Sequence, residues 1–195
     1  MACFTTFFNF ADRFERDVID RFVDAYVNGR TPNPCIDCNR YLKFDQLFVR
    51  AQELGCDYVV TGHYAQISYD EAKGRYLLRK AVDPLKDQSY VLWTLTQQQL
   101  SATRFPLGRL SKEEIRAIAL EQGLVSARKS DSQDICFVPD GDYASFICHH
   151  TGKDYPSGDF VDCQGNVLGR HQGIIHYTMG QRRGWGFPPT RDGCM

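Results

Sequence analysis

Two cysteines three positions apart, Cys35 and Cys38, are the residues with the most specific chemistry in this sequence. They lie in the segment RTPNPCIDCNR, where two prolines precede the thiols and Asn33, Asn39 and Arg40 prefer water or a polar ligand. Such a pair can supply half of a tetrahedral zinc site, act as a dithiol, or work with a distant thiol. The other residues of the sequence that could act with the pair decide which of these three kinds of site is favoured.

A zinc site needs four ligands, of which Cys35 and Cys38 would supply two. The sequence has no second Cys-X-X-Cys pair, so His63 and Cys136 are the candidates to complete a site in space. A thioredoxin-type dithiol opens a helix after a strand, and the helix N-terminus lowers a thiol pKa. Here two prolines stand where that strand would be, although a following helix would still act on the thiols. Both explanations stay open.

Cys136 offers a third explanation, which joins distant thiols. It lies between Ile135 and Phe137, as in a strand, and follows the polar residues 131–134, which are typical of a binding loop. If Cys38 and Cys136 face each other, one can carry sulfur as a persulfide while the other attacks or resolves it, leaving a disulfide. The remaining cysteines are expected to be small buried hydrophobes: Cys3, Cys56, Cys148, Cys163 and Cys194.

The composition indicates a globular protein with no strong overall field. The 195 residues are 43% hydrophobic, and 23 Lys and Arg against 24 Asp and Glu give a net charge of −1. A nucleic-acid contact would therefore depend on local cations. No apolar run approaches the roughly 18 residues needed to cross a bilayer, and the N-terminus lacks signal-peptide features. We expect a cytoplasmic protein with no membrane contact and mostly reduced thiols.

The elements that must position these residues follow from hydrophobic spacing. Apolar residues at four-residue steps predict a helix from Asp12 that ends at Gly29, and a second helix from Phe44 to Gly55 after a loop that carries the thiols. An apolar run from Tyr58 to Thr61 predicts a short buried strand. Helix, strand and turn in this order indicate an α/β unit.

The second half of the chain carries weaker signals. Ser111 and Glu114 have the spacing of a capping box, so a helix is expected to begin at Ser111 and end at Gly123. Alternation from Asp159 around a turn at residues 164–166 predicts a β-hairpin. A strand and a short helix complete the expected elements: Arg75–Asp83 and Tyr143–His150.

Five segments, in order along the chain, resemble one known family. TPNPCIDCNR, VVTGHYA, KDQSYVLW, SDSQDICFVPDGDY and YTMGQRRG are similar to the motifs of the MnmA-type tRNA 2-thiouridylases, over residues 9–186. The resemblance implies a Rossmann-like α/β domain of the PP-loop ATP-pyrophosphatase type, related to adenine nucleotide alpha hydrolases. It predicts an incomplete catalytic domain over residues 1–150 and the start of a small β-rich domain over 151–195.

The resemblance also implies an activity and its participants. The family uses ATP, with Mg²⁺ expected, to replace the C2 oxygen of wobble uridine in tRNA by sulfur from a cysteine persulfide, which a sulfur-relay donor protein supplies. By residue match, Cys38 is the nucleophile, Cys136 carries the persulfide, and the two can form a disulfide. Gly62 corresponds to an ATP-binding position. Asn33, Pro34 and Cys35 correspond to positions that contact the target base. Lys86, Asp87 and Gln88 correspond to positions that contact the tRNA.

General chemistry agrees with this assignment. A base is modified at its edge only after it leaves its stack, and a proline-stiffened loop with an amide suits a splayed pyrimidine. Phosphates need local cations, and many lie near the motifs: Arg30, Arg40, Lys43, Lys86, Arg128, Lys129, Arg182 and Arg183.

Two departures from the family pattern matter. Cys35 stands where many members have an aspartate proposed for proton transfer, and Asp37 is near but not equivalent. The sequence also has no SGGxDS loop to cradle the ATP phosphates. We expect a member truncated at both ends that does not adenylate uridine alone, and whose exposed sheet edge favours self-association.

Overall fold

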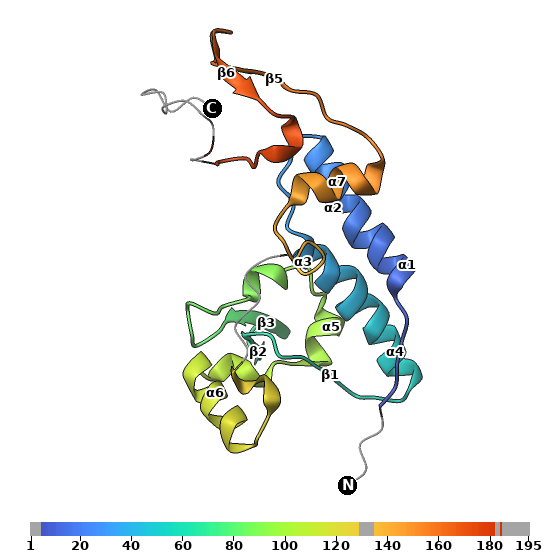
Figure 1. Cartoon of the computed structure of the whole chain (residues 1–195). Helices are drawn as coiled ribbons and strands as arrows, with labels where there is room; N and C mark the ends of the chain where they lie inside the picture. The colour runs from blue at the N-terminus through green and yellow to red at the C-terminus, as the bar shows by residue number, and fades with distance from the viewer. Residues whose placement is uncertain (1–4, 129–134, 182–183, 185–195) are drawn as a thin grey trace. The chain divides into compact units, whose positions relative to one another are not determined.

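A computed structural model describes residues 5–128, 135–181 and 184, and the chain divides into two compact units (Figure 1). The first unit comprises residues 1–17 and 35–131, and the second comprises residues 18–34 and 132–195. Neither unit is a continuous stretch of chain, because one short N-terminal segment of the sequence packs into the second unit.

A parallel pair of strands and an antiparallel hairpin lie in the first unit. Strand β1 (Val59–Val60) pairs in parallel with β4 (Thr103–Arg104), with Val59 opposite Thr103. Strands β2 (Ala65–Asp70) and β3 (Arg75–Lys80) form the hairpin. A parallel pair needs a crossover connection, which is the α/β arrangement expected from the sequence. The predicted strands at residues 58–61 and 75–83 are thus confirmed, with shorter bounds, but the first is not buried throughout as expected, since Val60 is 62% exposed.

The first unit also contains several helical segments. The π-helix η1 (Glu15–Ile19) continues α1 and crosses into the second unit. The others are mostly short: α1 (Ala11–Phe14), α3 (Pro34–Asp37), π-helix η2 (Cys38–Gln46), α4 (Leu47–Glu53), 3₁₀-helix η3 (Ser89–Val91), α5 (Gln97–Ser101), 3₁₀-helix η4 (Pro106–Arg109), α6 (Lys112–Glu121) and 3₁₀-helix η5 (Val125–Arg128).

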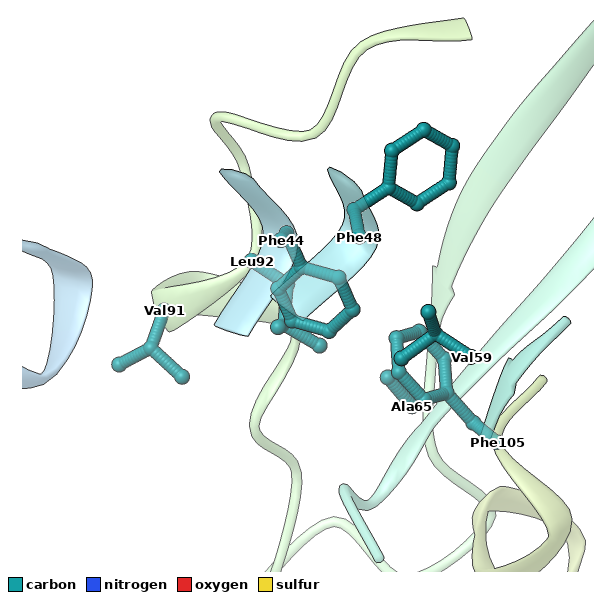
Figure 2. Packing of buried hydrophobic residues seen from close by; sticks show 7 residues of the cluster. All are labelled: Phe44, Phe48, Val59, Ala65, Val91, Leu92 and Phe105. Atoms are coloured by element: carbon teal, nitrogen blue, oxygen red, sulfur yellow. The ribbon is translucent and has the colours of Figure 1, made fainter. Parts of the chain in front are cut away.

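The core of the first unit joins the helix after the thiols to the parallel strands. Phe44 is fully buried and packs with Phe48 against Val59, Ala65 and Phe105, as Figure 2 shows. Burying a large apolar side chain stabilises the folded state by roughly 1.5–3 kcal/mol, so this cluster holds η2 and α4 against β1.

The second unit is built on aromatic packing. Its elements are α2 (Asp20–Val27), α7 (Tyr143–Thr151), the antiparallel strands β5 (Gly158–Val161) and β6 (Val167–His171), and 3₁₀-helix η6 (Ile174–His176). Phe22 is 1% exposed, and its ring meets that of Phe137 edge to face, with 5.3 Å between centroids. Ile147 and Ile175 complete this core. The predicted hairpin around residues 164–166 is confirmed.

The helix predictions are confirmed in position, but one boundary was wrong. The expected capping box is present, since the Ser111 hydroxyl accepts from the Glu114 amide at 3.2 Å and the Glu114 carboxylate accepts from the Ser111 amide at 2.7 Å. The segment with Cys35 and Cys38 was expected to be a loop. It is instead the start of a continuous helix from Pro34 to Glu53, made of α3, η2 and α4.

The prolines explain that error. Proline usually interrupts helices, yet its fixed φ and missing N–H suit the first helical position, which Pro34 occupies. The nine residues from Cys38 to Gln46 are then π-helical, a wide conformation that is rare and often found at functional sites. Hydrophobic spacing predicts neither feature.

Several expectations about the other cysteines were also wrong. Cys56 and Cys163 are exposed, whereas both were expected to be buried. Cys148 is half-buried and packs against the core of the second unit, as expected. Cys136 lies in a turn, not in a strand, because the Val138 amide donates to the Ile135 carbonyl at 2.9 Å. Cys3 and Cys194 lie outside the described residues.

Candidate functional site

The two thiols of the Cys-X-X-Cys pair lie on a helix fixed to a core. Cys35 is exposed in α3, and Cys38 is half-buried as the first residue of η2. Between them, Ile36 packs against the buried cluster of the first unit. Six residues after Cys38, Phe44 is fully buried in the same cluster. The thiols therefore have a rigid support, which a loop would not give them.

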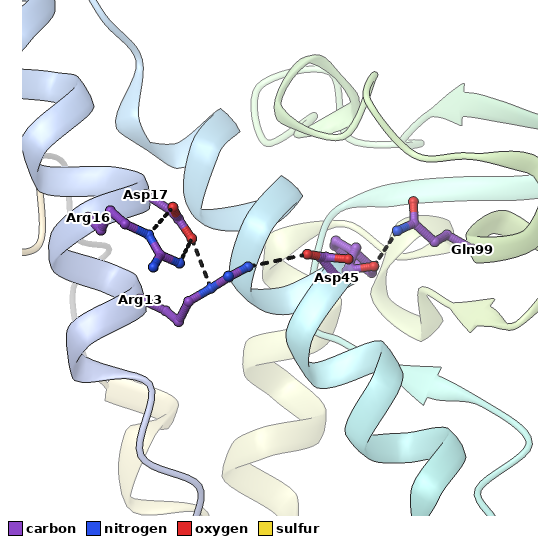
Figure 3. Close-up of polar contacts among 6 residues, drawn as sticks. Arg13, Arg16, Asp17, Asp45 and Gln99 are labelled. Carbon is purple, nitrogen blue, oxygen red and sulfur yellow. Dashed lines mark hydrogen bonds and ion pairs between the residues drawn. The ribbon is translucent and has the colours of Figure 1, made fainter.

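Polar contacts fasten the same helix to its neighbours (Figure 3). Arg13 of α1 lies 3.6 Å from Asp45 of η2 and 2.9 Å from Asp17. On the other side, the Gln99 side chain of α5 donates to the main-chain carbonyl of Phe44. Partly exposed ion pairs stabilise little, about 0–1 kcal/mol each. These contacts link η2, the helix that begins with Cys38, to α1 and α5.

The residues after β1 form a second part of the site. Gly62 is exposed, and the next residue, His63, is buried with its Nδ1 atom 2.7 Å from the Thr61 hydroxyl. The imidazole also packs beside the rings of both Phe44 and Phe105, at 6.0 and 5.8 Å between centroids. Burial, together with the charge of Lys43, lowers the pKa of His63 to about 4. The imidazole is thus neutral at physiological pH.

That shift predicts an acid-sensitive fold. The pKa of His63 is lowered from the ordinary 6.5 to about 4 in the folded state. Between these pH values the imidazole is protonated in the unfolded chain but not in the folded one, so the free energy of unfolding decreases as the pH is lowered. Full stability is expected above pH 6.5, with a loss of up to about 3 kcal/mol by pH 4. Urea unfolding measured from pH 4 to 7 tests this. The His63→Gln variant should show a flatter profile, and an equally steep one would assign the loss to other groups.

The Lys86–Gln88 segment is bound to the segment that contains Gly62. The Gln88 side-chain oxygen accepts from the Tyr64 amide at 3.0 Å, and the Gln88 amide donates to the Tyr64 carbonyl at 2.8 Å. Burial opposes ionisation of Asp87, but donors from Ala81 and Ser89 outweigh it and lower the Asp87 pKa. The side-chain oxygens of Asp87 and Gln88 therefore shape the loop, and their predicted tRNA contacts stay predictions.

A cavity of about 480 Å³ lies where the parallel strands end. Val60 is the last residue of β1, and Arg104 is the last residue of β4. Both line the cavity, as does the exposed Arg109. The Arg104 guanidinium is held in place, since it donates to the carbonyls of Ser101 and Thr103 at 2.9 and 2.8 Å and lies 3.9 Å from the Tyr58 ring centroid. In open α/β sheets, ligands bind outside the carboxyl ends of the strands. This cavity has that position.

Cys136 is the candidate thiol of the second unit. It is exposed, whereas Ile135 and Phe137 on either side pack against the core of that unit. Val138 is 1% exposed. The turn is therefore anchored on both sides of the thiol, much as Ile36 anchors the helix between Cys35 and Cys38. The sequence predicted a role for Cys136, which stays a prediction, but the strand expected around it is a turn.

The structure brings together part of the predicted site. Cys35, Cys38, Gly62 and residues 86–88 lie in the first unit, while Asn33, Pro34 and Cys136 belong to the second. Asn33 is exposed and Pro34 is buried. The expected binding loop at 131–134 and three of the candidate cations, Lys129, Arg182 and Arg183, lie outside the described residues. Across the described ranges, no three His, Cys, Asp or Glu side chains form a group that could hold a metal ion.

Sequence reasoning missed two features of the first unit. Arg104 and Arg109 meet at the cavity although they lie far from any quoted motif. Asn39 was expected to contact water or a polar ligand, yet it is 3% exposed. Its direct succession to Cys38 was the only sequence signal that could have drawn attention to it. Separately, no helix in the described parts of the chain is long and apolar enough to span a membrane.

Comparison with known proteins shows which family this chain matches. Residues 3–140 match the tRNA methyl transferase HUP domain, and residues 144–192 match the tRNA methyl transferase PRC-barrel domain. Over 178 residues, 91% of this chain, it is 52% identical to tRNA-specific 2-thiouridylase MnmA of Clostridioides difficile (strain 630) and 54% identical to that of Acetivibrio thermocellus. MnmA 1 of Thermoanaerobacter sp. (strain X514) is 55% identical over the same length.

Two facts follow from these matches. The chain spans about half the length of the curated relatives it matches, 49% and 50% of the first two. The Rossmann-like α/β class predicted from the motifs is confirmed, with a PRC-barrel segment after it. The predicted boundary at residue 150 stays a prediction. Since the first family match alone covers most of the 195 residues, the chain belongs to the tRNA methyl transferase HUP-domain family.

Proposed function

We propose that this chain carries the sulfur-transfer centre of a tRNA-uridine 2-sulfurtransferase that makes 2-thiouridine at the wobble position, U34. The observation that carries the proposal is 52–55% identity, across 91% of the chain, to relatives named tRNA-specific 2-thiouridylase. The family description refers to methyl transfer. An exposed thiol at Cys136 and a half-buried one at Cys38 favour sulfur chemistry instead.

The proposed reaction assigns one step to each thiol. The terminal sulfur of a Cys136 persulfide attacks C2 of uracil and displaces the activated oxygen, which leaves C2 bonded to Cys136 through two sulfurs. The Cys38 thiolate then attacks the Cys136 sulfur and breaks the sulfur–sulfur bond. Sulfur stays on C2, the two cysteines form a disulfide, and an external thiol reductant must restore them. Cys35 offers a second thiol beside Cys38, where it can compete for the disulfide.

ATP supplies the activation, since it converts the poor leaving oxygen at C2 into part of AMP. The cavity at the ends of β1 and β4 has a volume suited to a small-molecule ligand, and Arg104 and Arg109 give it positive charge. Gly62 lies two residues after β1. We therefore place ATP, with its Mg²⁺, in this region of the first unit. The proposal includes the need for an SGGxDS loop, which these 195 residues do not contain.

The remaining assignments concern partners. Asn33, Pro34 and Cys35 would contact the extruded base, and the Lys86–Gln88 loop would contact tRNA, with Lys86 as its cation. Nearby Arg40 and Lys43 would meet phosphates. The reaction takes place in the cytoplasm, and a sulfur-relay donor protein loads Cys136. One alternative has support from an observation: exposed Cys35 beside Cys38 also suits simple dithiol exchange.

The direct test is nucleoside analysis. Unmodified tRNA is incubated with ATP, Mg²⁺, a persulfide donor and the chain combined with residues that supply the phosphate loop, and 2-thiouridine is measured by mass spectrometry. Formation that requires ATP supports the proposal. If disulfide exchange proceeds while no 2-thiouridine forms under any of these conditions, the dithiol alternative holds.

We also expect the first unit to self-associate. Parallel sheets are normally covered on both faces, and one face of the β1–β4 pair packs on Phe44 and Phe48. On β1 and just before it, Val60 is 62% and Tyr58 51% exposed. Light scattering should detect dimers or larger species that Val60→Lys reduces, whereas Val82→Lys, at a site 60% exposed in a loop, should not. A monodisperse monomer at all concentrations would contradict this expectation.

A further inference from the structure

We propose that the side-chain amide of Asn39 binds the imide edge of the target uracil, with the ring N3–H donating to Asn39 Oδ1 and Asn39 Nδ2 donating to the ring O4. This inference rests on the proposed function, because it takes uridine as the base that meets Cys38. It assigns a further base-binding residue, in addition to the predicted contacts of Asn33, Pro34 and Cys35.

The first observation is an unsatisfied polar group. Asn39 is 3% exposed, and its Oδ1 atom is buried without a hydrogen-bond partner among the described residues. Buried polar atoms are nearly always paired, and an unpaired one lowers stability by about 1–3 kcal/mol. A native protein retains such an unpaired group where the group binds a ligand or takes part in a reaction. The amide therefore needs a donor that the described part of the chain does not provide.

The second observation is position. Asn39 directly follows Cys38, in the first turn of the π-helix η2. Phe44, five residues later on the same helix, is fully buried, and its carbonyl accepts from Gln99. Ile36, three residues before Asn39, packs against the same buried cluster. The backbone that carries Asn39 is thus held on both sides, and π-helical turns are frequent at functional sites. A fixed amide beside the nucleophile is suited to orienting a substrate.

The chemistry of uracil identifies the donor. The ring has one N–H group, at N3, and N3 is bonded to C2, the atom that receives sulfur. An acceptor at N3–H with a donor at O4 satisfies both groups of the amide. These two contacts leave C2 and its oxygen uncovered for activation and attack. No other single edge of the base presents a donor next to the reacting carbon.

A double-mutant cycle tests the contact. Binding of an anticodon stem-loop with U34 is compared with one that carries N3-methyluridine at that position, for the native chain and for Asn39→Ala. The native chain should bind the methylated loop about tenfold more weakly, the loss expected for one such pairing. In Asn39→Ala this difference should fall below about threefold. Gln52→Ala, an exposed amide on the same helix, should keep the tenfold difference.

A stability measurement supplies a second readout. Asn39→Leu has nearly the same shape and removes the unpaired amide, so its melting temperature should rise by a few degrees. A lower melting temperature would show that the folded protein already satisfies the amide, and would overturn the inference. So would an unchanged tenfold difference in Asn39→Ala.

These failures are distinct from failure of the proposed function. If the chain combined with residues that supply the phosphate loop makes 2-thiouridine, but Asn39→Ala discriminates N3-methyluridine as before, the function stands and the Asn39 contact is refuted. If neither loop binds to the chain combined with residues that supply the phosphate loop, and no 2-thiouridine forms, both proposals are overturned. A cysteine-alkylation rate at Cys38 that is equal in both proteins shows that the thiol itself is undisturbed.

Discussion

Replacing Cys38 by Ser is expected to abolish 2-thiouridine formation in the full-length enzyme context, with a loss of about a thousandfold or more. A hydroxyl at this position cannot break the sulfur–sulfur bond to Cys136, so the product would stay attached to the enzyme. The fold should be unaffected, since Cys38 is half-buried and Ser differs from it by one atom. Mass spectrometry of tRNA nucleosides gives the activity, and thermal melting gives the stability.

Two other cysteines are matched controls. Cys163 is exposed near the β5–β6 hairpin, and Cys148 packs against the core of the second unit. Cys163→Ser should leave activity unchanged, and Cys148→Ser should lower stability slightly without loss of turnover. Cys136→Ser should be as inactive as Cys38→Ser, because no persulfide can form. Equal activity of the Cys38→Ser protein and the native one would refute the assigned role.

The largest effect on stability is expected from Gly108→Ala. Gly108 is buried in η4, and a Cβ atom there would overlap the main-chain carbonyl of Ala65 in β2. Backbone cannot move aside as a flexible side chain can, so the hairpin must shift away from η4. We expect a loss of about 3 kcal/mol or more, equivalent to a melting temperature lower by roughly 10 °C.

Gly62→Ala is the control for that experiment. A Cβ at Gly62 would meet only the Leu107 side chain, at an ordinary 3.5 Å. Its unfolding free energy should therefore stay within about 1 kcal/mol of the native value. If Gly108→Ala is equally mild, the close approach of η4 to β2 is not as the structure describes it.

Hydrophobic spacing and capping chemistry foretold the fold where the signals are local. The helix opened by Ser111, the β-hairpin around residues 164–166 and the strand before Gly62 follow from short-range rules. The helix start at Pro34 did not, because proline indicates both helix breaks and first helical positions. The π-helix after Cys38 depends on tertiary packing of Phe44 and on the Gln99 contact, which no local pattern contains.

The candidate site residues were predicted from a different kind of signal. Ordered motifs pointed to Cys38, Cys136 and Gly62, whose roles stay predictions, whereas their charge and burial could not be inferred from the sequence. The low pKa of His63 arises mainly from burial beside Phe44 and Phe105, which come from distant segments of the chain. Asn39 looked like a solvated residue and is buried. The two units also do not follow the order of the sequence, since residues 18–34 belong to the same unit as the described residues from 135 onward.

The most direct test of the sulfur-transfer account is peptide mapping under non-reducing conditions after a single turnover, with no reductant added. The account predicts a disulfide between the peptides that contain Cys38 and Cys136, in an amount equal to the 2-thiouridine formed. A disulfide between Cys35 and Cys38 alone, with Cys136 still a thiol while product accumulates, would contradict it.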